Sequence, residues 1–155
     1  MRTLITGGTV INADGSTQAD VLVDGETIAA VGRGLAGTDE AVGVERTIDA
    51  TGKYVIPGAI DVHTHMELPF GGTFAKDTFE TGTRAAAFGG TTSIIDFAVQ
   101  SKGHSLREGL DAWHAKAEGI ATTDYGFHMI MSDVTPGSLA EMNELVSEGI
   151  TDFKL

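Results

Sequence analysis

The stretch Pro57-Gly58-Ala59-Ile60-Asp61-Val62-His63-Thr64-His65 lies where the sequence changes from one kind of structure to another. Within it, Ala59–His63 is a short apolar segment that ends in polar residues, which predicts a buried strand followed by a loop. Before this stretch, short strand patterns are separated by glycines, and after it strands alternate with helices. We therefore expect a β-rich lobe over residues 1–56 and a β/α region over residues 57–155.

The β-rich lobe carries several turn signals between short apolar segments. A turn at Gly7-Gly8 is flanked by Leu4-Ile5 and Thr9–Ile11. Two hairpins are expected after it: Asp20–Asp24 with Ile28–Val31 across Gly25-Glu26, and Thr47–Ala50 with Tyr54–Ile56 across Thr51-Gly52-Lys53. The glycine-rich stretch 32–43 between the hairpins predicts a loop.

The β/α region alternates predicted strands and helices. The strands expected after the first are Thr92–Phe97, Tyr125–Met131 and Ile150–Leu155. The helices are expected from a capping box at Asp77 and Glu80 to Gly89, from Ser105 to Glu118, and from Pro136 to Gly149, with Leu139, Met142, Leu145 and Val146 on one face of the last. This order predicts an α/β fold with a parallel sheet, either an open doubly wound sheet or part of an eight-stranded (β/α) barrel.

Composition excludes several classes of protein. The 155 residues contain 10 Lys and Arg against 22 Asp and Glu, a net charge of -12, so binding to nucleic acid or to an anionic membrane is not expected. The absence of cysteine excludes disulfides and thiolate metal sites. The chain has no long apolar run and no recognisable signal peptide, so we expect a cytoplasmic protein.

The histidines of the opening stretch are the first candidates for chemistry. His63 and His65 are two residues apart, so on a strand both imidazoles lie on the same side, at the strand end where β/α folds place their active sites. Two imidazoles can hold one zinc ion. Asp61 precedes His63 by two residues, where it can orient a metal-binding histidine without binding the metal itself. A pair of solvated surface histidines is the alternative.

The segments around this pair resemble a known family. Asp61-x-His63-x-His65 resembles the first metal motif of the amidohydrolase superfamily. The segments Glu67–Thr73, Phe79–Ala87 and Gly89–Phe97 are similar to the dihydropyrimidinase (D-hydantoinase) family, and the resemblance runs over essentially the whole chain. It implies the first four strands of a (β/α)8 TIM-type barrel, preceded by part of a small β-sandwich lobe.

The resemblance also implies a cofactor and a mechanism. Family members bind two divalent metals, usually zinc, bridged by a hydroxide and by a lysine carboxylated with carbon dioxide. In Gly149-Ile150-Thr151-Asp152-Phe153-Lys154 the matching lysine is Lys154, which thereby becomes a metal ligand and catalytic residue beside His63 and His65. The hydroxide opens the ring of a dihydropyrimidine or hydantoin to an N-carbamoyl amino acid. Without the resemblance, Lys154 is an exposed lysine at a strand end.

The loop after the histidines has two interpretations. In the family this loop walls the substrate pocket, which makes Leu68 and Phe70 candidates for substrate contact; packing between loop and barrel is the alternative. The remaining histidines are interpreted as structural (His128) or solvated (His104 and His114).

Two related functions are alternatives to a cyclic amidase that acts on neutral rings. Dihydroorotases and allantoinases place an arginine where this chain has Glu67, and a carboxylate there repels an anionic substrate. Collapsin response mediator proteins share the fold but lack metal ligands, whereas His63, His65 and Lys154 are present here.

The family's further ligands, two histidines and an aspartate, are not in these 155 residues. We therefore expect a fragment that is inactive alone, from a protein that forms homotetramers.

Overall fold

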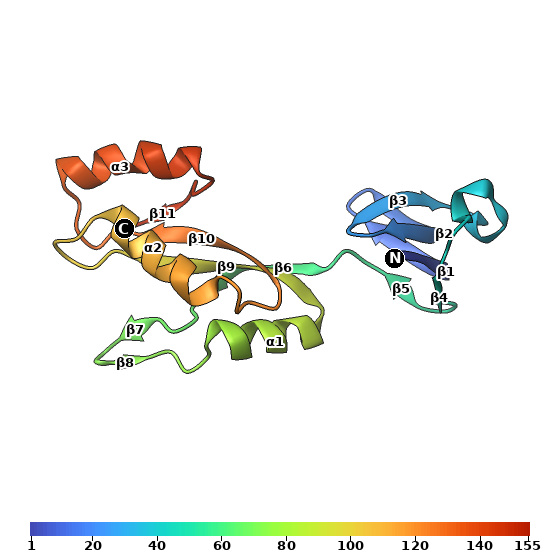
Figure 1. Cartoon of the computed structure of the whole chain (residues 1–155), viewed down its shortest axis with the longest axis horizontal. Helices are drawn as coiled ribbons and strands as arrows, with labels where there is room; N and C mark the ends of the chain where they lie inside the picture. The colour runs from blue at the N-terminus through green and yellow to red at the C-terminus, as the bar shows by residue number, and fades with distance from the viewer. The chain divides into compact units, whose positions relative to one another are not determined.

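The computed structural model describes all residues from 1 to 155 (Figure 1). The chain folds into two compact units, Met1–Pro57 and Gly58–Leu155, and each is described by itself. The first is all β apart from two short 3-10 turns, and the second alternates strands with helices.

The first unit is one five-stranded sheet in which β1 is central. Its strands are β1 (Arg2–Asn12), β2 (Gly15–Asp24), β3 (Thr27–Gly32), β4 (Arg46–Asp49) and β5 (Tyr54–Val55), with 3-10 turns η1 (Leu35–Gly37) and η2 (Asp39–Ala41) in the loop after β3. The order is β3-β2-β1-β4, and β5 also pairs with β1. The β2–β3 hairpin confirms the turn predicted at Gly25-Glu26.

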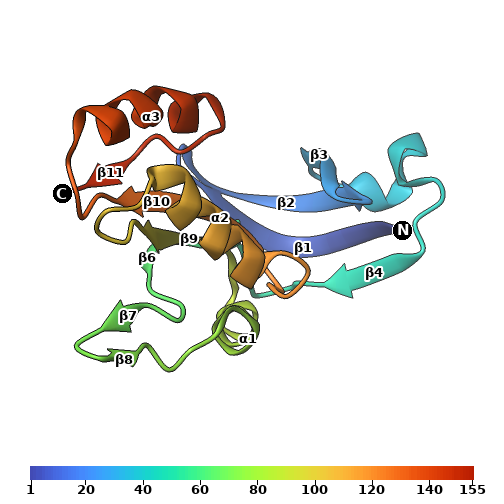
Figure 2. The ribbon, with the colours of Figure 1, turned by 60° about the vertical axis from the view of Figure 1, so that its left-hand side comes forward.

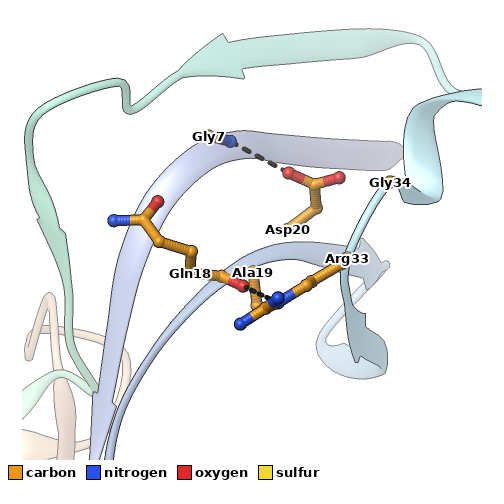
Figure 3. A pocket seen from close by; sticks show the side chains of 6 residues that line it. All are labelled: Gly7, Gln18, Ala19, Asp20, Arg33 and Gly34. Carbon is orange, nitrogen blue, oxygen red and sulfur yellow. Dashed lines mark hydrogen bonds between the residues drawn. The ribbon is translucent and has the colours of Figure 1, made fainter.

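The turn predicted at Gly7-Gly8 is wrong, because β1 runs straight through it. The pairing with β2 shifts register between Ile5 and Gly8, which is a β-bulge. Gly7 has a φ of 72°, and its N–H donates to the Asp20 carboxylate at 2.9 Å. Figure 3 shows the Asp20 side chain directed at Gly7. Glycine here permits a bulge within one strand and does not end the strand.

The second predicted hairpin of the lobe is also wrong, because β4 and β5 do not pair with each other. Both run parallel to β1, β4 beside Thr3–Thr6 and β5 beside Thr9-Val10. The turn between them carries the chain along the edge of β1. Alternation of apolar residues predicts that a segment is a strand, but it does not specify which strand it pairs with.

The second unit is a four-stranded parallel sheet with helices in the connections, in the order β6-β9-β10-β11 (Figure 1). Its strands are β6 (Ala59–Thr64), β9 (Thr91–Val99), β10 (Asp124–Ile130) and β11 (Phe153–Lys154). The helices are α1 (Phe79–Gly89), α2 (Leu106–Ala117) and α3 (Pro136–Ser147), and none is long and apolar enough to cross a membrane. The predicted α/β fold with a parallel partial barrel is confirmed.

Helix ends largely follow the expected signals. Ser105 caps α2, and Thr135 with Pro136 begins α3. The start of α1 differs by one residue, because the capping box is formed by Thr78 and Thr81. Each of these two threonine hydroxyls accepts from the backbone N–H of the other residue, so Thr78 serves as the cap without the predicted Asp77.

The core of the second unit lies between the sheet and the three helices. Ile94 and Ala98 of β9 face this core, where they join Phe127 and Met129 of β10 and the buried helix residues Phe79, Leu106, Leu110, Trp113 and Leu145. Of the four residues on the predicted face of α3, Leu145 is fully buried and Met142 packs against the core, whereas Leu139 and Val146 are exposed. We call the side of the sheet that faces this core and the helices the helix-covered face, and the opposite side the open face.

A small hairpin follows β6. Its strands are β7 (Pro69–Phe70) and β8 (Thr73–Phe74), and the turn contains Gly71 and Gly72, both with positive φ. Figures 1 and 2 show the hairpin extending away from the four-stranded sheet. It connects the end of β6 to α1.

Candidate metal centre

The strand β6 is an edge strand and is exposed, not buried as its apolar sequence predicts. Ile60 and Val62 are 62% and 55% exposed. Only β9 lies beside it, so its outer edge and much of its surface have no covering element among these residues. What holds its carboxyl end is a set of polar contacts from neighbouring elements.

A bulge in β6 determines where the two histidines point. Asp61 pairs with Ile94 and Thr64 pairs with Asp96, so three steps along β6 match two along β9. Paired residues of neighbouring parallel strands lie on the same face, so Thr64 shares the helix-covered face with Asp96. His63 and His65, on either side of Thr64, therefore lie on the open face.

The two imidazoles converge. The Nε2 atoms of His63 and His65 are 3.2 Å apart, and the ring planes are nearly perpendicular. Two nitrogens each about 2.1 Å from a tetrahedral zinc ion lie about 3.4 Å apart. The pair therefore has the spacing of two ligands of one metal ion.

The surroundings of His65 favour its neutral imidazole. Burial lowers its pKa below the ordinary 6.5, and the neighbouring His63 and Lys154 lower it further, while Asp96 opposes them. A neutral imidazole keeps a free lone pair on one nitrogen. The Nδ1 atom of His65 is buried without a hydrogen-bond partner, although ligating histidines usually donate their second N–H to a carbonyl or carboxylate.

The ring of Phe97 is the centre around which the candidate residues gather. Its centroid lies 4.6 Å from the His63 ring, 5.1 Å from the His65 ring and 4.9 Å from the His128 ring. The Nζ atom of Lys154 lies 4.8 Å from it. Phe97 and Lys154 also line an open hollow of about 330 Å³ together with His128, Asp152 and Phe153.

Lys154 thus extends from the other edge of the sheet to the Phe97 ring, which the histidines also contact. The strand β11 is separated from β6 by two strands, and the long lysine side chain spans part of that distance. Lys154 is nevertheless exposed, not buried, because only β10 lies beside β11. No three His, Asp or Glu side chains of the structure form a cluster that could hold a metal ion. The donors present, two imidazoles and an amine, fit part of such a centre.

The other predicted site residues lie apart from this cluster. Asp61 accepts a hydrogen bond from the backbone N–H of His63 at 3.1 Å, so it contacts the backbone of His63 and not its ring. Leu68 packs against the helix-covered core, and Phe70 is 79% exposed in the β7–β8 hairpin. His104 and His114 are exposed.

Two further residues lie near the histidines: His128, which the sequence indicated only as structural, and Asp96, which it did not single out. His128 contacts the carbonyl of Val62 at 3.1 Å through Nε2 and lies 3.5 Å from the Asp152 carboxylate through Nδ1, so it spans from β6 to the segment before β11. Asp96 is completely buried under the end of β6. The signal for Asp96 is a lone carboxylate inside the apolar strand Ile94-Ile95-Asp96-Phe97.

Comparison with known proteins shows the family. Residues 54–153 match the sequence model of the amidohydrolase family, and this match covers most of the chain. The chain belongs to that family.

Within it, the chain is similar to hydantoinases and dihydropyrimidinases. It is 63% identical over 153 residues to a D-hydantoinase of Streptomyces coelicolor and 43% identical over 155 residues to a dihydropyrimidinase of Rattus norvegicus, covering 99% of this chain and 33% and 30% of those proteins. The crystal structure of a dihydropyrimidinase from Brevibacillus agri superposes with a TM-score of 0.92 at 51% identity, over 100% of this chain and 33% of that one. The chain spans about a third of the length of these relatives.

Proposed function

We propose that these 155 residues supply the first metal ligands of a cyclic amidase that opens dihydropyrimidine or hydantoin rings. The observation that carries the proposal is the convergence of the His63 and His65 Nε2 atoms, 3.2 Å apart, beside the Phe97 ring that Lys154 also contacts. The relatives named for hydantoins and dihydropyrimidines support the choice of substrate.

His63 and His65 are proposed to bind one metal ion through Nε2. Their spacing suits a tetrahedral ion, and the lowered pKa of His65 keeps protons from competing for its lone pair near neutral pH. Asp61 is proposed to support His63 through the backbone.

Lys154 is proposed to join two metal ions after carboxylation. Its uncharged amine adds to carbon dioxide, a C–N bond forms, and the nitrogen releases a proton to water. The resulting carbamate is an anion with two oxygens, whereas an ammonium has no lone pair to offer. Divalent ions, usually zinc in this family, would supply Lewis acidity that polarises a ring carbonyl and activates water near neutral pH.

The substrate is proposed to be a neutral ring. Glu67 follows the histidines, is half-buried, and places a carboxylate where a dihydroorotase-type enzyme needs a cation for its anionic substrate. Phe70 is exposed in the hairpin and available to contact a ring substituent, whereas Leu68, packed on the core, is proposed to fix the base of the same loop.

Metal analysis and turnover test the proposal. The whole gene product that contains these residues is purified and its metal content measured, together with hydrolysis of dihydrouracil and hydantoin. We expect about two divalent ions per chain and ring opening with both substrates. The 155 residues alone hold only three of the ligands that the family uses, so we expect weak metal binding and no turnover from them. Tetramer formation and a cytoplasmic location stay predictions.

Lys154→Ala provides the sharpest variant, with Lys102→Ala, an exposed loop lysine, as its control. We expect Lys154→Ala to reduce the metal content and to abolish ring opening, while Lys102→Ala retains both. Full activity in Lys154→Ala would remove this residue from the site, and a metal-free active protein would contradict the proposed function.

A further inference from the structure

Asp96 is a buried carboxylate without a cation beside it. It lies on β9, is 0% exposed, and forms none of the ion pairs of the structure. A charged group is costly to bury unless hydrogen bonds satisfy it. Its three hydrogen bonds come from the end of β6, from Met66 just after it, and from α2.

The hydrogen bonds of Asp96 hold the backbone on both sides of His65. Its Oδ2 accepts from the Thr64 hydroxyl at 2.8 Å and from the Met66 backbone N–H at 2.7 Å. Its Oδ1 accepts from the Trp113 indole N–H of α2 at 2.9 Å. His65 therefore sits between two residues that are tied to the same carboxylate.

Neighbouring contacts hold the next residue as well. Glu67 has a φ of 52°, the only non-glycine residue with positive φ, so the chain turns sharply directly after Met66. The Glu67 N–H donates to the Asp77 carbonyl at 2.9 Å, and its carbonyl accepts from Lys116 at 3.4 Å. Lys116 also lies over the Trp113 ring, 4.0 Å from its centroid. The contacts around Asp96 thus extend past the end of β6.

All three donors facing Asp96 are N–H or O–H groups, which explains why a carboxylate is present. An ionised carboxylate is an acceptor at both oxygens, whereas the amide of asparagine presents a donor at one of them. Asparagine would therefore direct an NH2 group against Trp113 or against Thr64 and Met66. A purely apolar residue would leave these donors unsatisfied at the strand end.

We propose that Asp96 is a positioning residue for the metal centre: by fixing Thr64 and Met66 from the helix-covered face, it sets the direction in which His65 points on the open face. The inference rests on the proposed function, because it concerns how His65 meets a metal ion. Asp96 itself contacts neither imidazole ring. It acts through the backbone of His65, which lies between the partners Thr64 and Met66.

Cobalt binding tests the inference. The whole gene product is prepared metal-free and titrated with Co²⁺, and the visible absorption spectrum of the bound ion reports its ligand geometry. The variants are Asp96→Asn, Thr64→Val, which removes the hydroxyl at nearly constant shape, and Thr64→Ser, which retains it. Leu145→Ala is the control for general destabilisation, because Leu145 is fully buried on α3 and makes none of these hydrogen bonds.

The expected results separate positioning from stability. We expect Co²⁺ affinity to fall about 10- to 100-fold in Asp96→Asn and about tenfold in Thr64→Val, with an altered spectrum in both, as for other residues that support metal ligands. Thr64→Ser should retain the wild-type spectrum and affinity. Leu145→Ala should lower the unfolding temperature and leave the spectrum unchanged.

Three outcomes would overturn the inference. Wild-type spectra and affinities in both Asp96→Asn and Thr64→Val would show that His65 keeps its direction without the carboxylate, while the proposed function would stand. The same spectral change in Leu145→Ala would show that the effect is general destabilisation. Absence of Co²⁺ binding by the wild-type protein would instead contradict the proposed function, and this inference with it.

Discussion

The two faces of the parallel sheet of the second unit differ, although the side chains of one strand, β9, lie on both. Along β9, the side chains of Ile94, Asp96 and Ala98 are buried under the helices. Phe97 lies on the open face, where its ring contacts the imidazoles of the candidate site and Lys154. The helix-covered face is completed by elements of this unit. The open face has polar and charged groups that converge without a full set of partners.

This difference separates stability from chemistry. The helix-covered face holds most of the buried apolar side chains of the unit, so substitutions of these apolar residues, as distinct from Asp96, should change the free energy of unfolding. The open face carries the donors for a metal, so substitutions there should change ion binding with little effect on folding. The first two of the following four predictions test this separation, and the other two test smaller contributions to stability.

The largest effect is expected on the open face, from replacing both His63 and His65 with alanine. Removing both imidazoles eliminates one metal position, so ring opening by the whole gene product should fall at least about a thousandfold, roughly 4 kcal/mol in transition-state stabilisation. Kinetics with dihydrouracil and metal analysis measure this. A doubly substituted protein that keeps its metal and activity would place the centre elsewhere.

Leu110→Ala is the matching change on the helix-covered face. Leu110 is 1% exposed on α2, so its truncation leaves a cavity that costs about 2–5 kcal/mol of unfolding free energy. The thermal unfolding midpoint should drop clearly, and the metal content of the folded protein should stay that of the wild type. Loss of metal in proportion to loss of stability would break the proposed separation of the two faces.

A smaller effect is expected at the start of α1. The Thr78 hydroxyl accepts from the Thr81 N–H at 3.1 Å, and Thr78→Ala removes this cap at a cost of about 1 kcal/mol. Thr78→Ser keeps the hydroxyl and should be close to the wild type. Equal thermal unfolding midpoints for the alanine and serine variants would show that the cap contributes nothing.

The smallest effect is expected from the ion pair between α2 and the end of α3, where Arg107 and Glu148 are 2.8 Å apart. The hydrogen bond from Arg107 lowers the pKa of Glu148 below its ordinary value. A carboxyl whose pKa is lower in the folded protein adds stability above its ordinary pKa and loses it as the pH falls through the folded value. Arg107→Gln should therefore unfold at a slightly lower temperature than the wild type at pH 7, and the difference should shrink as the pH falls below the ordinary value of 4.5 and vanish once Glu148 is protonated in the folded protein.

Unfolding midpoints across this pH range measure the difference, with Arg84→Gln, another exposed helix arginine, as the control. The pair is exposed, so added salt should reduce the effect at pH 7. A difference that grows on acidification would mean that the assumed direction of the linkage is wrong.

Sequence predicted the elements of the β/α region better than those of the lobe. Its strands and helices are separated by distinct signals such as Ser105, Pro136 and Gly90, and parallel β/α order leaves few alternatives for pairing. In the lobe, Gly7-Gly8 has the composition of a turn, but a bulge uses glycine for the same conformational freedom. Local sequence does not distinguish the two.

Part of the candidate site was also open to prediction. The spacing of His63 and His65 indicated a shared side, and the resemblance indicated Lys154; the structure gathers all three around Phe97. The involvement of Phe97 and His128 depends on contacts between strands far apart in sequence. Asp96 depends on the register of β6 against β9, which no local pattern specifies.

The bulge in β6 makes the pairing of that strand with β9 a functional property. With regular pairing after Asp61 and Ile94, His63 would stand opposite Asp96 and point toward the helices. Deleting Val62 would instead remove the extra residue, and regular pairing would then keep Thr64 opposite Asp96 and both imidazoles on the open face. The extra residue and the bulge that accommodates it therefore belong together, because an unshortened β6 without the bulge would turn both imidazoles to the other side of the sheet.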